Sequence, residues 1–348
     1  MSAQSDFVKD IWYFAGVSGD VKPGQLTRVE IADEPITLGR KKDGSIFALR
    51  DICPHWAAPL SAGRIVEDTV ECPYHGWRFG TENGQCRSIP ALASDSDVKP
   101  DKIKVRHFPT REDGQLIWVW MASDKKGSGQ PDVEPPVIPF VTSKPVIDDI
   151  LELNCSMDQA VIGLMDPAHG PYVHQNSWWR TQKSMHDKEK LFEPRPLGFA
   201  MARHTPSSNS FAYKILGGKP ETEITFYLPG ARTEEIKVGK RTILSLTVVS
   251  PVSELKSTIR QLFFTDMLKF KAILPIARAG ALKFLKQDQA IMNLQQQSLP
   301  YNPKRMYVGD ADAQARWYFA FKKEWAAHRK EGREFIHPVK SQVLKYRS

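Results

Sequence analysis

The sequence predicts an α+β protein of two domains, an all-β domain at residues 1–135 and a domain that mixes strands and helices at residues 136–348. The chain has 348 residues, and a single hydrophobic core rarely serves so long a chain. Residues 24–122 alternate short apolar runs with turn residues, which is typical of many short strands. The remaining residues show strand-like and helix-like patterns in turn.

In the first domain, Asp43-Gly44 separates two strand-like segments of LTRVEIADEPITLGRKKDGSIFALRD, which predicts a hairpin turn. The run GQLIWVWMA, residues 114–122, is rich in β-branched and aromatic residues and is expected to be the last strand. Residues 123–139, SDKKGSGQPDVEPPVIP, are polar and rich in Gly and Pro, which is typical of a linker. We therefore place the domain boundary after residue 135.

The second domain begins with a segment, residues 151–167, that we expect to be helical as far as Pro167. Residues 198–266 return to strand-like alternation, as in TEITFYLPG and RTILSLTVVS. Two helical patterns follow, at residues 269–297 and 310–330, and Asp310 or Asp312 is the expected N-cap of the second.

Composition excludes several classes of protein. Apolar residues make up 41% of the chain and charged residues 25%, as in a globular enzyme. The net charge of +8 comes from Lys and Arg spread along the chain, which favours an acidic protein partner over nucleic acid. No apolar run is long enough for a membrane span, and no secretory signal is evident, so we expect a cytoplasmic protein. With four cysteines no disulfide framework is expected, and Cys86 and Cys155 are interpreted as buried thiols.

Two short segments place one cysteine and one histidine each in tight, proline-containing loops. Cys53 and His55 come from Cys-Pro-His, and Cys72 and His75 come from Cys-Pro-Tyr-His. A structural zinc site is one interpretation, but zinc usually takes its ligands from paired Cys or paired His knuckles. The arrangement fits a [2Fe–2S] cluster of the Rieske type better, in which two cysteines hold one iron and two histidines the other.

The segments DICPHWAAPLSAGRI and ECPYHGWRFG resemble the cluster-binding loops of the Rieske-type non-haem iron oxygenases, in their catalytic α subunits. Trp56 departs from that pattern, because members commonly carry Arg after the first histidine. The resemblance implies a second domain of the helix-grip type, an antiparallel sheet flanked by helices, that holds a mononuclear iron.

A second motif, MDPAHGPYVH at residues 165–174, contains two histidines five residues apart. On an uninterrupted helix, residues five apart point about 140° away from each other, so His169 and His174 could not face one metal. We expect Gly170-Pro171 to break the helix and bring His174 back. Asp166 is expected on the helical face of His169, within reach of its imidazole. Taken alone, the two histidines are polar side chains of a helix-turn.

The resemblance gives these residues their roles. It implies that His169 and His174 ligate a mononuclear Fe(II), that Asp288 on a C-terminal helix is the third ligand, and that Asp166 passes electrons from a cluster histidine of a neighbouring subunit. Asp288 precedes an Ile-x-x-x-Gln-Gln run at Ile291. Many members have Asn shortly before the bridging Asp, where this chain has Ile162 and Gly163, so we expect a more open or more apolar surrounding there.

The same resemblance implies a homotrimer and an NAD(P)H-dependent reductase or ferredoxin as the electron donor. The chain is most similar to the vanillate and dicamba O-demethylase group, which favours O2-dependent monooxygenation of a small aromatic or related compound with O- or N-dealkylation. Two alternatives stay open, a ring-hydroxylating dioxygenase and a Rieske electron carrier without catalysis. Five apolar residues are candidates for the substrate pocket, although ordinary core packing is the safer interpretation for each: Trp178, Trp179, Phe211, Phe226 and Leu246.

Overall fold

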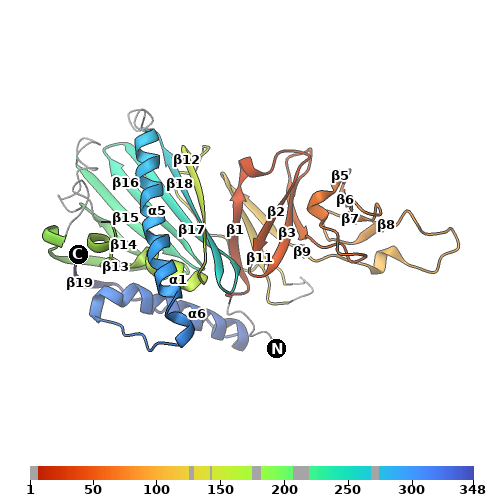
Figure 1. The fold of residues 1–348 in the computed structure, drawn as a ribbon. Helices are drawn as coiled ribbons and strands as arrows, with labels where there is room; N and C mark the ends of the chain where they lie inside the picture. The colour runs from red at the N-terminus through yellow and green to blue at the C-terminus, as the bar shows by residue number, and fades with distance from the viewer. Residues whose placement is uncertain (1–6, 125–128, 142, 175–181, 207–218, 268–273) are drawn as a thin grey trace. The chain divides into compact units, whose positions relative to one another are not determined.

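A computed structural model describes residues 7–124, 129–141, 143–174, 182–206, 219–267 and 274–348. The chain divides into two compact units, Met1–Val137 and Ile138–Ser348. The division lies inside the Gly- and Pro-rich segment of residues 123–139, two residues beyond the boundary expected from the sequence. Each unit has its own sheets (Figure 1).

The described part of the first unit contains three antiparallel sheets, ordered β1-β11-β10, β2-β3-β4-β9 and β5-β6-β7-β8. The described part of this unit contains no α-helix, as expected for an all-β unit. The strands are β1 (Ile11–Val17), β2 (Leu26–Ile31), β3 (Glu34–Arg40), β4 (Ile46–Arg50), β5 (Arg64–Val66), β6 (Thr69–Glu71), β7 (Arg78–Gly80), β8 (Cys86–Ser88), β9 (His107–Phe108), β10 (Thr110–Asp113) and β11 (Leu116–Met121).

The turn at Asp43-Gly44 joins β3 to β4, as the sequence predicts. Gly44 has a φ of +93°, which side-chain-bearing residues rarely adopt, and the Asp43 carboxylate accepts hydrogen bonds from Ser45. The last strand is also where the sequence places it, and every residue of β11 is buried. Its partner β1 lies ahead of the strand-like region recognised in the sequence and pairs Trp12 with Trp120.

The second unit is built on one antiparallel sheet of eight strands, in the order β12-β18-β17-β16-β15-β14-β13-β19. Helix α5 crosses this sheet, and α1 lies between α5 and α6 (Figure 1). The strands are β12 (Ile147–Leu153), β13 (Asp187–Arg195), β14 (Gly198–His204), β15 (Pro220–Tyr227), β16 (Ala231–Val238), β17 (Arg241–Ser253), β18 (Lys256–Thr265) and β19 (Gln342–Arg347). The helices are α1 (Met157–Met165), α2 (Gly170–Val173), α5 (Leu274–Gln296) and α6 (Ala313–Glu331).

Three local expectations for this unit were wrong or incomplete. Residues 151–153 belong to strand β12, and the helix begins only at Met157, after Ser156 caps it by accepting a hydrogen bond from the Gln159 amide. Strands β13 and β19 were not expected. Asp312 does occupy the N-cap position of α6, but its carboxylate accepts from the Val308 amide and caps no helical N–H.

Aromatic packing fixes α6 against the sheet. The Trp317 ring lies 5.4 Å from that of Phe192 on β13 and 5.1 Å from that of Phe199 on β14, both edge to face. Phe226 and Leu246 are buried in this unit, which agrees with ordinary packing. Trp178, Trp179 and Phe211 lie outside the described residues. Of the helices that the structure describes, none combines the length and the apolarity of a membrane span.

Candidate metal centres

The two Cys/His segments of the first unit form loops with the same backbone closure. The Cys53 amide donates to the Ala58 carbonyl and the Ala57 amide to the Cys53 carbonyl. In the second loop the Cys72 amide donates to the Trp77 carbonyl, and the Gly76 amide donates to the Cys72 carbonyl. The fifth residue of each loop has a positive φ, +59° at Ala57 and +69° at Gly76. The two loops therefore share one backbone closure, although the histidine is the third residue of the first loop and the fourth residue of the second.

The four candidate ligands converge between the loops. The Nδ1 atoms of His55 and His75 lie 3.1 Å apart, and the thiols of Cys53 and Cys72 are buried close together. Burial raises the pKa of Cys53, which the backbone amides of His55 and Trp56 oppose by donating to its sulfur. The raised pKa of Cys53 means that this thiol ionises near neutral pH only beside a cationic centre such as a metal. Two sulfurs and two imidazole nitrogens in separate pairs suit the two irons of a Rieske cluster.

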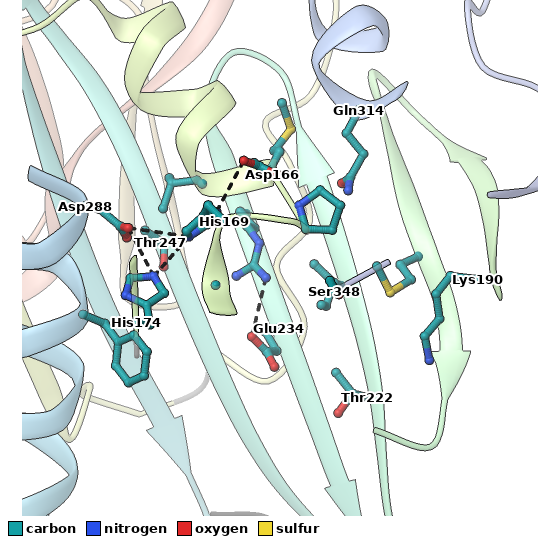
Figure 2. A pocket seen from close by; sticks show the side chains of 18 of the residues that line it. Asp166, His169, His174, Lys190, Thr222, Glu234, Thr247, Asp288, Gln314 and Ser348 are labelled. Carbon is teal, nitrogen blue, oxygen red and sulfur yellow. Dashed lines mark hydrogen bonds and ion pairs between the residues drawn. The ribbon is translucent and has the colours of Figure 1, made fainter. Parts of the chain in front are cut away.

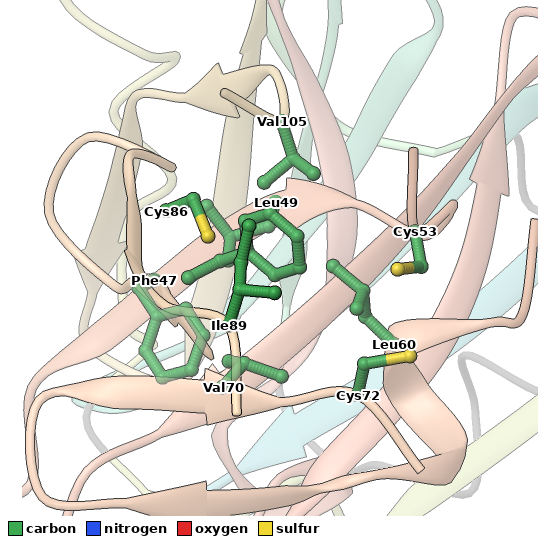
Figure 3. Packing of buried hydrophobic residues seen from close by; sticks show 10 residues of the cluster. Phe47, Leu49, Cys53, Leu60, Val70, Cys72, Cys86, Ile89 and Val105 are labelled. Atoms are coloured by element: carbon green, nitrogen blue, oxygen red, sulfur yellow. The ribbon is translucent and has the colours of Figure 1, made fainter. Parts of the chain in front are cut away.

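The other cysteine of this unit has no part in that site. Figure 3 shows Cys53 and Cys72 together at one side of a hydrophobic cluster and Cys86 across it, with Phe47 and Leu49 among the cluster. Cys86 is buried and free, and so is Cys155 of the second unit. Both agree with the expectation of buried thiols.

Aromatic rings surround the two histidines. Trp77 stacks on His55 at a centroid distance of 4.7 Å and an interplanar angle of 10°. Trp56, the departure from the family pattern, packs edge-on to His55 but is 69% exposed, and Tyr74 beside His75 is 64% exposed. Trp56 thus adds apolar surface around the exposed histidine instead of a charge.

Asp51 anchors the first loop. Its buried carboxylate accepts hydrogen bonds from the Thr37 hydroxyl, the Ser61 amide and hydroxyl, and Arg28. Burial would raise the pKa of Asp51, but these hydrogen bonds outweigh burial and hold the pKa below its ordinary value. A lowered pKa means that Asp51 stabilises the fold above about pH 4, and that this stabilisation is lost as the pH falls through the folded-state pKa.

We expect Asp51→Ala to destabilise the first unit by about 3 kcal/mol at pH 7, because it leaves buried donors of Thr37 and Ser61 unpaired. Thermal unfolding followed through the visible absorbance of the cluster should show a midpoint roughly 10 °C lower. The gap to the native protein should narrow below about pH 4. The control is Asp68→Ala, which removes an exposed carboxylate whose one ion pair with the described residues is to Lys41. Equal midpoints for the two variants would contradict this role.

In the second unit, the helix ends close to Pro167, as expected, but Gly170-Pro171 do not form the break. Helix α1 ends at Met165, because Asp166 precedes Pro167 and adopts an extended ψ of 118°. Gly170 and Pro171 start the single turn α2, where the missing amide of proline costs nothing. His169 and His174 are the caps at the two ends of this turn. Asp166 and His169 therefore do not share a helical face, and Asp166 approaches His169 across the break.

Three side chains meet at one point, from two distant parts of the chain. The Nε2 atoms of His169 and His174 lie 3.0 Å apart, and the Oδ1 atom of Asp288 lies 3.6 Å and 3.2 Å from them (Figure 2). Ligands at right angles on a metal, each about 2.1 Å from it, are about 3.0 Å apart. Two of the separations are close to this value and the third, from His169 to Asp288, is longer by about 0.6 Å, so a small shift of one side chain would give one triangular face of an octahedral metal. The opposite face would stay open, as in the two-histidine, one-carboxylate sites of non-haem iron.

The outer contacts of this group were not predicted. The Nδ1 atom of His174 lies 3.0 Å from the Oε1 atom of Gln287, an oxygen that can only accept, so this nitrogen donates and leaves Nε2 for a metal. Phe284 packs edge-on to the same ring. Gln287 and Phe284 occupy positions on α5 near Asp288, and the helical spacing around Asp288 was the only signal in the sequence that could have found them.

The Gln-Gln pair after Ile291 joins the helices that carry the site. Gln295 accepts a hydrogen bond from the Gln159 side chain of α1, and Gln296 donates to the same residue. Gln159 also donates to the Met292 carbonyl. The Cβ that a residue other than glycine would have at position 163 would meet the Met292 side chain at 3.0 Å. Gly163 thus lets α1 and α5 approach, which holds His169 and Asp288 at a fixed spacing.

Asp166 lies beside His169, but its carboxylate is not one of the three groups that converge. Its Oδ2 atom is 3.7 Å from the Nδ1 atom of His169, too far for a hydrogen bond, while its Oδ1 atom accepts from the Ala168 amide. The Nδ1 atom of His169 is buried and has no hydrogen-bond partner among the described residues. A shift of less than 1 Å would join this nitrogen to the carboxylate.

Two cavities meet at the three-residue group. One, of about 290 Å³, extends over the sheet and includes His174, Thr247 and Phe284 in its wall. The other, of about 510 Å³, lies between α1 and α5 and includes Ile162, Gly163 and the exposed Met306. Asp166, His169 and Asp288 line both. Ile162 and Gly163, around which a more open or more apolar surrounding is expected, line the second cavity.

Comparison with known proteins gives the first unit its identity, because the Rieske [2Fe-2S] domain family matches residues 11–109. The dicamba O-demethylase oxygenase component of Stenotrophomonas maltophilia is 31% identical over 233 residues, 65% of this chain and 62% of that protein. The chloroacetanilide N-alkylformylase oxygenase component of Rhizorhabdus wittichii is 33% identical over 180 residues, which are 49% of this chain and 48% of that protein. Chlorophyllide a oxygenase of Arabidopsis thaliana is 29% identical over 174 residues, which are 50% of this chain and 30% of that protein. The matches span less than two thirds of these relatives' lengths.

A solved structure extends the likeness over both units. Dicamba monooxygenase bound to dicamba has a TM-score of 0.73 over 92% of this chain and 99% of its own, at 23% identity. At that identity the likeness shows a common fold, and it confirms the expected α+β class with its helix-flanked antiparallel sheet. The first unit therefore contains a Rieske [2Fe-2S] domain, and the chain as a whole has the fold of dicamba monooxygenase.

Proposed function

We propose that this chain is the terminal oxygenase component of an NAD(P)H- and O2-dependent system that monooxygenates a small aromatic or related compound and removes an O- or N-alkyl group. The observation that carries the proposal is the convergence of His169, His174 and Asp288 at the wall of a cavity. A mononuclear Fe(II) held by these three atoms would supply O2 activation beside the bound substrate. Cys53, His55, Cys72 and His75 would hold the Rieske cluster.

The protein side chains have separate tasks in this proposal. Gln287 orients His174, and the contact between α1 and α5 keeps the two histidines at a constant spacing from Asp288. Asp166 lines the second cavity beside His169, and electrons from the donor pass to the iron site by way of this residue. The donor is the cluster of a neighbouring subunit, in a homotrimer closed by head-to-tail contacts. The exposed rings of Trp56 and Tyr74 beside the cluster histidines suit such a contact.

The volume of the cavity and the names of two relatives support dealkylation of a small substrate. A cavity of about 290 Å³ is at the lower end of the roughly 300–1,000 Å³ of small-molecule sites, which suits a compound of one ring. Two of the relatives are named for O-demethylation and N-alkyl cleavage. Oxidation of a methyl C–H bond by one oxygen atom gives a hemiacetal or hemiaminal that releases formaldehyde, while two electrons and two protons reduce the other oxygen atom to water. A ferredoxin or a reductase supplies these electrons from NAD(P)H.

We expect the protein, with a generic reductase and a panel of methoxy and N-methyl aromatic compounds, to form one formaldehyde for each substrate and each O2 consumed. Mass spectrometry of the products and an oxygen electrode measure both quantities, and reactions without reductase are the control. A diol without formaldehyde would support the ring-hydroxylating alternative. An absence of O2 consumption with every substrate, in protein that contains iron beyond the cluster, would contradict an oxygenase.

A further inference from the structure

Helix α5 carries a methionine, Met292, one turn after Asp288, at the wall of the second cavity. His169 and Asp288 line the same cavity, whose volume is about 510 Å³. Two other residues of this wall are exposed, Met306 at 83% and Ile291 at 38%, so the cavity is open to solvent. Met292 itself is only 3% exposed. A molecule of the size of water can therefore approach, through the cavity, a side chain that is otherwise buried.

The same side chain is part of the contact between α1 and α5. The Cys155 thiol, just ahead of α1, donates to the Sδ atom of Met292 at 3.8 Å. A Cβ at position 163 of α1 would lie 3.0 Å from the Cε atom of Met292, so there is no space between this methyl group and the helix. The Met292 carbonyl accepts a hydrogen bond from Gln159 of α1. A change in the size or polarity of Met292 should therefore disturb the contact of the two helices.

The two sulfur atoms of this contact differ in their reactivity. Burial raises the pKa of Cys155 to about 11, so its thiol stays protonated at neutral pH. Oxidants attack the thiolate form of cysteine, whereas the thioether of methionine is oxidised without losing a proton. Cys155 is also fully buried and lines neither cavity. Met292 is therefore the sulfur that an oxidant in the cavity reaches and oxidises.

We propose that Met292 is a site of oxidative modification, at which hydrogen peroxide in the second cavity converts the thioether to a sulfoxide. The O–O bond breaks, one oxygen atom bonds to the Sδ atom, which loses two electrons, and the other oxygen atom leaves as water with both protons. Two electrons and two protons convert O2 to hydrogen peroxide when no substrate is oxidised. The proposal rests on the proposed function for this source of peroxide, but the reactivity of Met292 toward added peroxide does not.

A sulfoxide at Met292 should weaken metal binding through the contact of α1 with α5. Oxidation makes an apolar side chain polar and larger, at a place where Gly163 leaves no space for it. His169 follows α1 and Asp288 lies on α5, so a looser contact changes the spacing of these two metal ligands. Loss of a group that supports metal ligands lowers metal affinity by about 10–100-fold. We expect the oxidised protein to bind the mononuclear iron at least about 10-fold more weakly.

The test is peptide mapping by mass spectrometry after a short treatment of the protein with hydrogen peroxide, in the presence of a chelator of free iron. The gain of one oxygen atom is measured at every methionine. Met267 is the internal control, because it is also 3% exposed but lines neither cavity. We expect Met292 to be oxidised at least about 10-fold faster than Met267. Equal rates at the two residues, or no oxidation of Met292, would overturn the proposal.

Two variants test the consequence for the metal. Met292→Leu keeps an apolar side chain of similar volume without a sulfur atom, and Met267→Leu is its control. After peroxide treatment the native protein and Met267→Leu should lose mononuclear iron, and Met292→Leu should keep it, each relative to its own untreated sample. Methionine sulfoxide reductase and added Fe(II) should then restore the iron content of the native protein. Iron loss from Met292→Leu at the native rate would contradict this role.

A failure of the proposed function has a different signature. Added peroxide would then still oxidise Met292 faster than Met267, while no substrate of the panel would give formaldehyde.

Discussion

Asp288→Ala is expected to abolish oxygenation and to lower the iron content from about three atoms per chain to about two, the two of the cluster. Asp288 supplies one of three converging atoms, so its removal leaves two histidines with no anionic ligand. Substitution of a residue that only supports a metal ligand lowers metal affinity by about 10–100-fold, and loss of a ligand itself should lower the affinity further. Iron analysis and product formation measure both effects, while the visible spectrum of the cluster should stay unchanged.

Two further variants show whether the effect is specific to the carboxylate. Asp288→Glu keeps the anionic ligand on a longer side chain and should retain part of the iron and of the turnover. Lys286→Ala changes an exposed residue two positions earlier on the same helix and should retain all of both. If Asp288→Ala kept three irons per chain and formed product, Asp288 would not be a ligand.

The sequence predicted the parts of the site that depend on short spacings. The two Cys/His loops each close over six residues, so the four residues that converge there could be named from adjacent letters. The same is true of the turn at Asp43-Gly44, where glycine supplies a positive φ. Asp288 is different, because it lies 114 residues after His174, and only the family resemblance connected the two.

Other features followed from tertiary contacts that local patterns do not contain. The segment at residue 151 has apolar and acidic residues in an order compatible with helix or strand, and pairing with β18 decides for strand. The helix ends at Met165 and does not continue to Gly170, because Pro167 restricts Asp166, the residue before it. Gln287 could not be recognised, since its role depends on the imidazole of His174 arriving from α2.

Asp166→Asn is expected to lower NADH-coupled oxygenation at least about 100-fold while both metal sites keep their iron. Asparagine has nearly the shape of aspartate and can still accept from the Ala168 amide through its oxygen. The change is therefore confined to the atom that faces His169, where a carboxylate oxygen becomes an amide group. In a single turnover of reduced protein with substrate and O2, the cluster should reoxidise more slowly than in the native protein. Asp187→Asn, which alters an exposed carboxylate of β13, is the control.

Mixed assemblies decide whether the electrons cross between subunits. One subunit type carries Cys72→Ser and lacks a cluster, and the other carries Asp166→Asn, so neither type has both an intact cluster and an intact Asp166. Transfer between subunits lets the cluster of the second type serve the iron of the first, so the co-expressed mixture should regain part of the activity that each type lacks alone. Transfer within a subunit predicts no recovery. An inactive mixture of correctly assembled, iron-containing subunits would contradict the proposed route, and full activity of Asp166→Asn alone would remove Asp166 from it.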